Sequence, residues 1–176
     1  MSGAMDQLYQ QLILDHAKAP HGRGLAEDFD AESFQVNTTC GDEIRLRVHL
    51  RRGPDAGRGP DSAEEPVIDA VTWEGLGCSI SQASASVLTD LVAGCPVPTA
   101  ERLSDQFKAL MHARGQGLDP QVEEQLGDAT AFTGVARYPA RIKCALLGWM
   151  ALHDALLQSG ALDPSDVAGT TQEENS

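Results

Sequence analysis

Apolar and polar residues alternate strictly over residues 43–50, the clearest pattern in the chain. Ile44 and Leu46 fall on one face of this segment, whereas Arg45 and Arg47 fall on the other. A period of two residues is typical of a β-strand with one buried face. Two more segments are interpreted in the same way, residues 32–37 and 66–75. Together they predict a small antiparallel sheet of three strands with one covered face.

Most of the remaining chain has the spacing of amphipathic helices, with apolar residues three and four positions apart. The predicted helices are residues 5–17, about 80–94, 99–113, a short segment ending near residue 127, and a long helix that begins at Pro139. The last of these is apolar almost all round after its first turn, so it is predicted to be largely buried. The sequence therefore predicts an α+β fold with several helices packed on one face of the sheet.

A length of 176 residues favours one domain with its own hydrophobic core. We expect this domain to span residues 5–158. Residues 1–4 and 159–176 are predicted to be disordered tails, since the C-terminal stretch is polar and ends in charged and small residues. Residues 51–66 are rich in glycine, proline and charge, which predicts a long exposed loop.

The charge of the chain narrows the classes of partner. Asp and Glu number 26 against 13 Lys and Arg, a net charge of −13, which argues against binding to nucleic acid because phosphate recognition needs cationic patches.

We expect no membrane segment, since no run approaches the roughly 20 apolar residues that a spanning helix needs. The N-terminus lacks a basic region followed by an apolar one, so the protein is predicted to be cytoplasmic.

The four cysteines are the candidate chemistry of the chain. In a reducing compartment, widely spaced cysteines are typical of metal ligands or reactive thiols rather than disulfides. Cys40 lies in a turn before a strand, Cys78 lies between a strand and a helix, and Cys144 lies near the start of the last helix. Side chains at the ends of elements can converge without disturbing the core. Cys95 lacks this pattern and is predicted to be a small, inert core residue.

Three thiolates and the carboxylate of Asp42 would make a tetrahedral zinc site. Spacing alone indicates this weakly, because separations of 38 and 66 residues match no short zinc motif. For Cys40 by itself, an Asx-type turn beside a buried thiol fits equally well. The histidines add no ligand to this prediction: His16 and His21 are expected to be solvated, and His153 is out of helical phase with Cys144.

Thiol activation is a second expectation from the residues alone. Cys78 would lie at a helix N-terminus, where the positive end of the helix dipole favours a thiolate. Cys144 has Arg141 one turn earlier and Lys143 beside it, and both cations would favour a thiolate there.

Four motifs carry a resemblance to a known family. They are Y-x-x-L-I-L-D-H-x-x-x-P-H at 9–21, T-C-G-D at 39–42, G-x-G-C-S-I-S at 75–81 and R-I-K-C-A-L-L-G-W at 141–149. In this order they resemble the U-type iron–sulfur cluster assembly proteins, the IscU-like family. The resemblance runs from about residue 5 to residue 158, and the order of three cysteine motifs makes it specific.

Two features are similar to the SufU subgroup of that family. Lys143 stands where the scaffold branch carries a histidine, and a protonated lysine has no lone pair for a metal. The separation of Cys78 from Cys144 is also longer than in the scaffold branch. The resemblance implies an IscU/SufU-like fold and a zinc-dependent sulfurtransferase that accepts persulfide sulfur and relays it for iron–sulfur cluster assembly.

The resemblance also implies roles for individual residues. Zinc would be held by Cys40, Asp42, Cys78 and Cys144, with Cys40 as the sulfur acceptor and Arg141 promoting transfer. The implied partners are a pyridoxal-phosphate-dependent cysteine desulfurase of the SufS kind and a downstream iron–sulfur assembly scaffold.

Two other functions fit the same residues. The first is a scaffold on which an iron–sulfur cluster is assembled and then transferred, because cysteines suit iron as well as zinc. The second is a noncatalytic interaction domain stapled by structural zinc, although such sites are usually closed and rich in cysteine. Three measurements would distinguish the sulfurtransferase, the scaffold and the structural-zinc domain. They are the stimulation of a desulfurase, the metal content of the purified protein and its colour.

Overall fold

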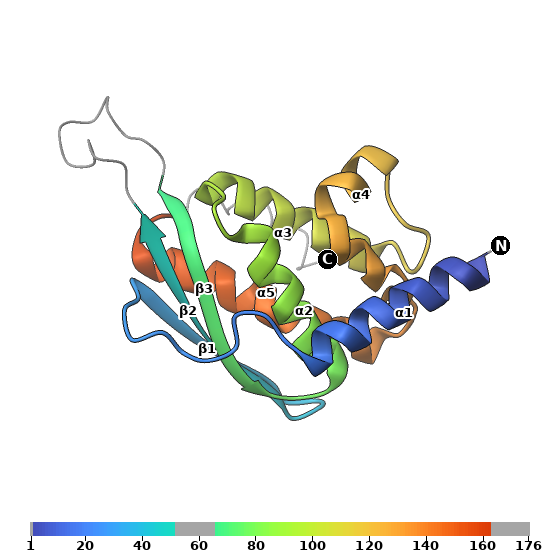
Figure 1. The fold of residues 1–176 in the computed structure, drawn as a ribbon, viewed down its shortest axis with the longest axis horizontal. Helices are drawn as coiled ribbons and strands as arrows, with labels where there is room; N and C mark the ends of the chain where they lie inside the picture. Colours follow the sequence, from blue (N-terminus) through green and yellow to red (C-terminus); the bar gives the residue numbers. More distant parts are fainter. Residues whose placement is uncertain (1, 52–65, 163–176) are drawn as a thin grey trace, which may run out of the picture.

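A three-stranded antiparallel sheet forms one layer of the computed structural model, which describes residues 2–51 and 66–162 (Figure 1). Strand β1 is Ala31–Asn37, β2 is Asp42–Arg51 and β3 is Val67–Leu76. Their order is β1-β2-β3, so β2 is central and pairs antiparallel with both neighbours. The predicted sheet is therefore confirmed, and each strand lies within one residue of its expected bounds.

Helices gather on one side of this sheet (Figure 1). They are α1 (Ser2–Lys18), α2 (Ser79–Val92), α3 (Val97–His112), α4 (Pro120–Leu126), the 3₁₀ segment η2 (Gly127–Arg137) and α5 (Pro139–Ser159). This arrangement confirms the predicted α+β fold class. None of the helices in the described part of the chain combines the length and apolar character that crossing a membrane requires.

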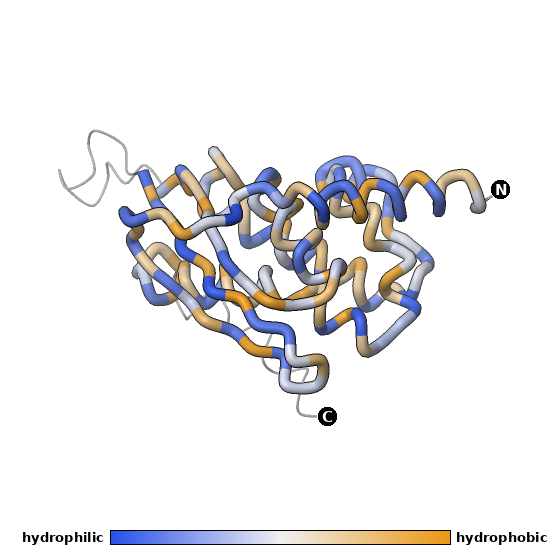
Figure 2. Tube along the Cα trace, turned by 60° about the horizontal axis from the view of Figure 1, so that its bottom comes forward, coloured by the Kyte–Doolittle hydropathy of each residue, from blue (hydrophilic) through white to orange (hydrophobic). Residues whose placement is uncertain are grey.

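The core lies between the helices and the inner face of the sheet. Leu46, Val48 and Trp73 are almost completely buried on that face, and the alternation that places them there is visible along the strands in Figure 2. Phe107 of α3 stacks on Trp149 of α5 with ring centroids 4.9 Å apart. Burial of such large side chains contributes most of the stability of a domain of this size.

The outer face of the sheet carries a small charged network. The Glu32 carboxylate accepts hydrogen bonds from Arg47 Nε at 2.6 Å and from Arg45 Nη1 at 2.7 Å. These two guanidinium groups, Arg47 first, hold the pKa of Glu32 below its usual range. The network links the edge strand β1 to the central strand.

Helices α2 and α5 cross at very short range. A Cβ atom built on Gly148 of α5 would lie 3.5 Å from the Cα of Ala85 in α2 and 3.6 Å from Cδ1 of Ile44. Ser84, on the same helix as Ala85, donates a hydrogen bond to the Ala145 carbonyl at 2.6 Å. Small residues thus let the two helix backbones pack nearly in contact.

The structure differs from the sequence predictions in three places. Helix α1 begins at Ser2, so residues 2–4, predicted to belong to a disordered tail, continue the helix. Segment η2 was predicted neither as a helix nor as a 3₁₀ segment. His16 is buried rather than solvated, because α1 turns that side chain toward α2. Most of the predicted 51–66 loop and residues 163–176 of the predicted tail lie outside the described residues.

Candidate metal centre

The hairpin between β1 and β2 places the first two predicted ligands. Asn37 pairs with Asp42 at the end of the ladder, and its carbonyl accepts a hydrogen bond from the Gly41 amide at 2.8 Å. The Asn37 side chain accepts a second one from the Thr39 amide at 3.1 Å, an Asx turn. Gly41 has φ of +75°, a left-handed conformation that glycine adopts at little cost. The tight turn leaves Cys40 exposed at its tip and directs Asp42 inward, where it is 3% exposed.

Cys78 follows β3 and is the N-cap residue of α2. Its backbone N–H donates to Oδ1 of Asp42 at 3.2 Å, and its thiol lies 3.6 Å from Oδ2 of the same carboxylate. Gly77 makes this approach possible: a Cβ there would lie 2.9 Å from Asp42 Oδ1 and 2.4 Å from the hydroxyl of Ser81. The end of β3, the start of α2 and the β1–β2 turn therefore meet at Asp42.

Cys144 contributes a buried sulfur from the first turns of α5. Its Sγ atom lies 3.6 Å from Sγ of Cys40 and 3.6 Å from the carbonyl of Ala140. The Asn37 amide donates to the Cys144 sulfur at 3.8 Å, so the residue that shapes the hairpin also contacts the thiol.

The donor atoms of Cys40, Asp42 and Cys144 all lie within 4.8 Å of one another, a separation compatible with one metal ion. The Cys78 sulfur lies next to this group, 3.6 Å from Oδ2 of Asp42. Three sulfurs and one carboxylate oxygen match the ligand types and the number that zinc takes. The structure thus brings Cys40, Asp42 and Cys144 together and places Cys78 beside them, in contact with Asp42, and the chemistry of this donor set fits a divalent, thiophilic cation.

The electrostatics of the cluster also suit a cation. Burial raises the pKa of the Cys144 thiol well above its usual range, and hydrogen bonding to Asp42 raises it further. Cys40 and Cys78 add smaller contributions in the same direction. The expectation that Arg141 and Lys143 would favour a thiolate at Cys144 differs from this raised pKa, because both cationic side chains are exposed whereas the thiol is buried. A bound cation would stabilise the thiolate that this environment otherwise disfavours.

Arg141 lies in the first turn of α5 and lines an open groove of about 760 Å³ beside Cys78. The groove runs between α1 and the end of η2, and Tyr138 and Arg137 line it as well. No ion pair of Arg141 is formed within residues 2–51 and 66–162. The guanidinium is therefore available to a molecule that enters the groove.

Cys95 stands apart from the cluster, and Asn37 is a site position that was not predicted from the sequence. The Cys95 thiol donates to the Leu91 carbonyl at 3.2 Å, at the far end of α2 from Cys78. Asn37 and Gly77 shape the site without being candidate ligands. Asn37 has a sequence signal, since an asparagine two residues before a threonine and a glycine-containing turn favours an Asx turn.

Comparison with known families gives one match. The NifU-like N-terminal domain matches residues 8–145, well over half of the chain. The chain belongs to this family. Its cysteine motifs resemble those of the IscU and SufU proteins, and the family match supports that resemblance.

Individual members of the NifU-like family are similar over most of their length. Zinc-dependent sulfurtransferase SufU of Bacillus subtilis (strain 168) is 38% identical over 149 residues, 85% of this chain and 89% of the relative. Iron-sulfur cluster assembly scaffold protein IscU of Streptococcus pyogenes serotype M1 is 35% identical over 155 residues, 88% of this chain and 86% of the relative. The crystal structure of FiSufU from Fervidobacterium islandicum AW-1 has a TM-score of 0.66 and 30% identity, covering 85% of this chain and 97% of that structure.

Proposed function

We propose that this member of the NifU-like family is a zinc-dependent sulfurtransferase that accepts persulfide sulfur from a cysteine desulfurase and relays it for iron–sulfur cluster assembly. The observation that carries the proposal is the grouping of the Cys40 and Cys144 sulfurs with the Asp42 carboxylate, with the Cys78 sulfur 3.6 Å from that same carboxylate. Cys40 and Cys78 are exposed at this point, whereas Cys144 is buried. The similarity to a protein named zinc-dependent sulfurtransferase SufU supports it.

Cys40, Asp42, Cys78 and Cys144 would hold the zinc ion. When bound, the ion keeps the thiols deprotonated and shields them from oxidation. The protein contributes a rigid setting for three of these ligands. Asp42 and Cys144 are buried, and Cys78 is fixed by its backbone hydrogen bond to Asp42. Cys40 and Cys78 are both exposed, but Cys40 lies on a hairpin turn that ends in a left-handed glycine, so it is the ligand proposed to leave.

The transfer step is a thiol–disulfide-type exchange at Cys40. Its thiolate attacks the terminal sulfur of a persulfide on the partner cysteine. A sulfur–sulfur bond forms to Cys40, the sulfur–sulfur bond of the donor breaks, and the partner cysteine leaves as a thiolate. The terminal sulfur keeps its oxidation level, so no external oxidant or reductant takes part. The persulfide on Cys40 is then the form that a downstream assembly scaffold would receive.

Arg141 is proposed to promote this exchange as a positioning residue. Its exposed guanidinium lines the groove beside Cys78, close to the mouth of the site. A cation there favours the approach of an anionic persulfide and lowers the cost of the negative charge on the leaving thiolate. The proposed donor is a pyridoxal-phosphate-dependent cysteine desulfurase of the SufS kind.

Desulfurase turnover with and without this protein tests the proposal. We expect the zinc-loaded protein to stimulate the enzyme and the chelated protein to lose that effect. Cys40→Ala should abolish stimulation and carry no persulfide, whereas Cys95→Ala, a matched cysteine outside the cluster, should behave as the unchanged chain. Undiminished stimulation by the Cys40 variant would remove that residue from the acceptor role.

A second candidate function is assembly of an iron–sulfur cluster on the same residues. It is favoured by the 35% identity to a protein named iron-sulfur cluster assembly scaffold protein IscU. Lys143 argues against it, because the position next to Cys144 offers no imidazole to iron. A brown purified protein that contains acid-labile sulfide and donates clusters would support the scaffold, and a colourless protein that contains zinc and no acid-labile sulfide would support sulfur transfer.

A further inference from the structure

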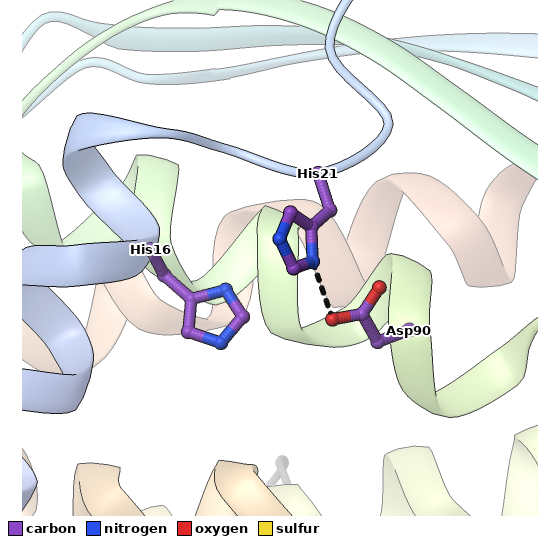
Figure 3. Close-up of side chains that lie close together, drawn as sticks. All are labelled: His16, His21 and Asp90. Atoms are coloured by element: carbon purple, nitrogen blue, oxygen red, sulfur yellow. Dashed lines mark hydrogen bonds and ion pairs between the residues drawn. The ribbon is translucent and has the colours of Figure 1, made fainter.

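A second group of metal-ligating side chains lies at the junction of α1 and α2 (Figure 3). His16 comes from the end of α1, His21 from the loop that follows, and Asp90 from the last turns of α2. One donor atom of each lies within 4.8 Å of the other two. His21 Nδ1 is 2.6 Å from Asp90 Oδ2, and the two imidazole centroids are 5.0 Å apart.

One side chain of this cluster is buried and the other two are exposed to solvent. The His16 side chain is 10% exposed, whereas those of His21 and Asp90 are 56% and 49% exposed. His16 is therefore held in one place by its surroundings, and its two neighbours are free to adjust around it. This division suits a ligand that enters from solvent.

Hydrogen bonds around His16 orient it as a metal ligand. Ser86 Oγ accepts the backbone N–H of His21 at 2.7 Å and lies 2.7 Å from Nδ1 of His16. The opposite nitrogen, Nε2, lies 3.6 Å from the carboxylate of Asp128. In the tautomer with the proton on Nε2, that proton faces Asp128, and Nδ1 accepts a hydrogen bond from the Ser86 hydroxyl, which a bound ion would replace. A carboxylate behind a histidine is the arrangement that commonly supports metal-bound imidazole.

His21 completes the set from the other side. Nδ1 of His21 and Oδ2 of Asp90 share a hydrogen bond of 2.6 Å (Figure 3), and a bound ion would take the place of the proton between them, so that both atoms turn a lone pair to the ion. Zinc–nitrogen bonds of about 2.0–2.1 Å place tetrahedral ligand atoms roughly 3.3 Å apart. Donor atoms as far as 4.8 Å apart would therefore have to converge by about 1.5 Å or less, whereas His21 Nδ1 and Asp90 Oδ2, at 2.6 Å, would move slightly apart. Rotation of these two exposed side chains can supply both changes.

This cluster is distinct from the cysteine site. Cys78 caps the start of α2 and Asp90 lies twelve residues later, so at 1.5 Å per residue the two points are about 18 Å apart along the helix. None of the four proposed cysteine-site ligands contributes to it.

We propose that His16, His21 and Asp90 form a second site, for a divalent transition-metal ion of the class that prefers imidazole and carboxylate ligands, with zinc as the reference ion. Water would complete the coordination, because the mouth is open. The acidic chain, with a net charge of −13, lowers the cost of holding a further cation. The bound ion would tie the loop after α1 to α2.

Metal content of the full, untagged chain tests the proposal. After equilibration with buffered zinc and removal of free ion, mass spectrometry should find two equivalents in the unchanged protein. His21→Ala and Asp90→Asn should each lower the affinity for the second zinc ion by at least about tenfold. Substitution of residues that only support a metal ligand already lowers affinity by that factor. His112→Ala is the matched control: it removes an exposed histidine at the end of α3 and should retain both equivalents.

Cobalt separates this test from that of the cysteine site. Thiolate-bound Co²⁺ absorbs strongly by charge transfer, whereas Co²⁺ on imidazole and carboxylate does not. The first equivalent of Co²⁺ should show the charge-transfer absorption in every variant, and the second equivalent of Co²⁺ should not. A single equivalent in the unchanged chain, or a second one that survives His21→Ala, would overturn the histidine site. Absence of the charge-transfer band would instead count against the cysteine site alone.

Discussion

Gly77→Ala is a sharp test of the cysteine site, because it perturbs a proposed ligand without replacing one. The backbone of Gly77 is not in the left-handed region, so alanine can adopt it. The added Cβ would lie 2.9 Å from Oδ1 and 3.0 Å from Cγ of Asp42, where ordinary contacts begin at 3.4 Å. It would also lie 2.4 Å from Ser81 Oγ, but that hydroxyl can rotate away. The strain therefore falls on the carboxylate.

The size of the effect follows from these distances. Asp42 must retreat by about half an ångström, which stretches its 3.2 Å hydrogen bond from the Cys78 amide beyond the useful range. Loss of a hydrogen bond to a buried carboxylate costs about 1–3 kcal/mol of folding stability. A displacement of this kind in the support of a metal ligand weakens affinity by roughly 10–100-fold.

Competition with a chromophoric chelator would measure zinc affinity, and urea unfolding of the zinc-free protein would measure stability. Gly134→Ala provides the control, since a Cβ there meets no atom within 4 Å. Asp42→Asn should show at least the same loss of zinc affinity. If Gly77→Ala binds zinc as tightly as the unchanged chain, the carboxylate does not take part in the site as argued.

Two further predictions concern charged side chains. Arg141→Ala should lower desulfurase stimulation by roughly tenfold and leave zinc affinity unchanged, because the residue lines the groove and is not a ligand; complete loss of zinc in that variant would contradict this role. Glu32→Gln should cost about 0.5–1 kcal/mol in urea unfolding near neutral pH. Since the folded-state pKa of Glu32 is lowered, its contribution is present above the usual glutamate range and is lost as pH falls through the folded-state value, so the two proteins should become equally stable in acid.

The sheet and the long helices were predictable because their signals are local. The alternation over residues 43–50 matched the buried face of β2, which includes Ile44 and Leu46. Segment η2 had a readable signal that was missed, because its buried residues Ala129, Phe132 and Ala136 are three and four positions apart. His16 had a readable signal that was missed: it stands three residues after Ile13, on the inward face of the same helix.

The metal centre was less accessible to sequence reasoning from the residues alone. Spacing could not show that Cys40 meets Cys144, because their approach depends on how α5 packs across the sheet. The residue types indicated the ligand set only weakly, and the family resemblance made it specific. The rise in the Cys144 pKa was also beyond local reasoning, since burial is a property of the assembled fold and outweighs nearby charges in the sequence.

The near contact of α2 and α5 at Ala85 and Gly148 gives the centre unequal mechanical properties. Cys78 and Cys144 are attached to these two closely packed helices, and the packing restricts how far the helices can shift relative to each other. Cys40 is attached to a single turn that ends in a left-handed glycine. Release of the Cys40 sulfur from the metal therefore requires a change in a few backbone dihedrals of that turn. The same sulfur can then bind again to the donor set that Asp42, Cys78 and Cys144 still form.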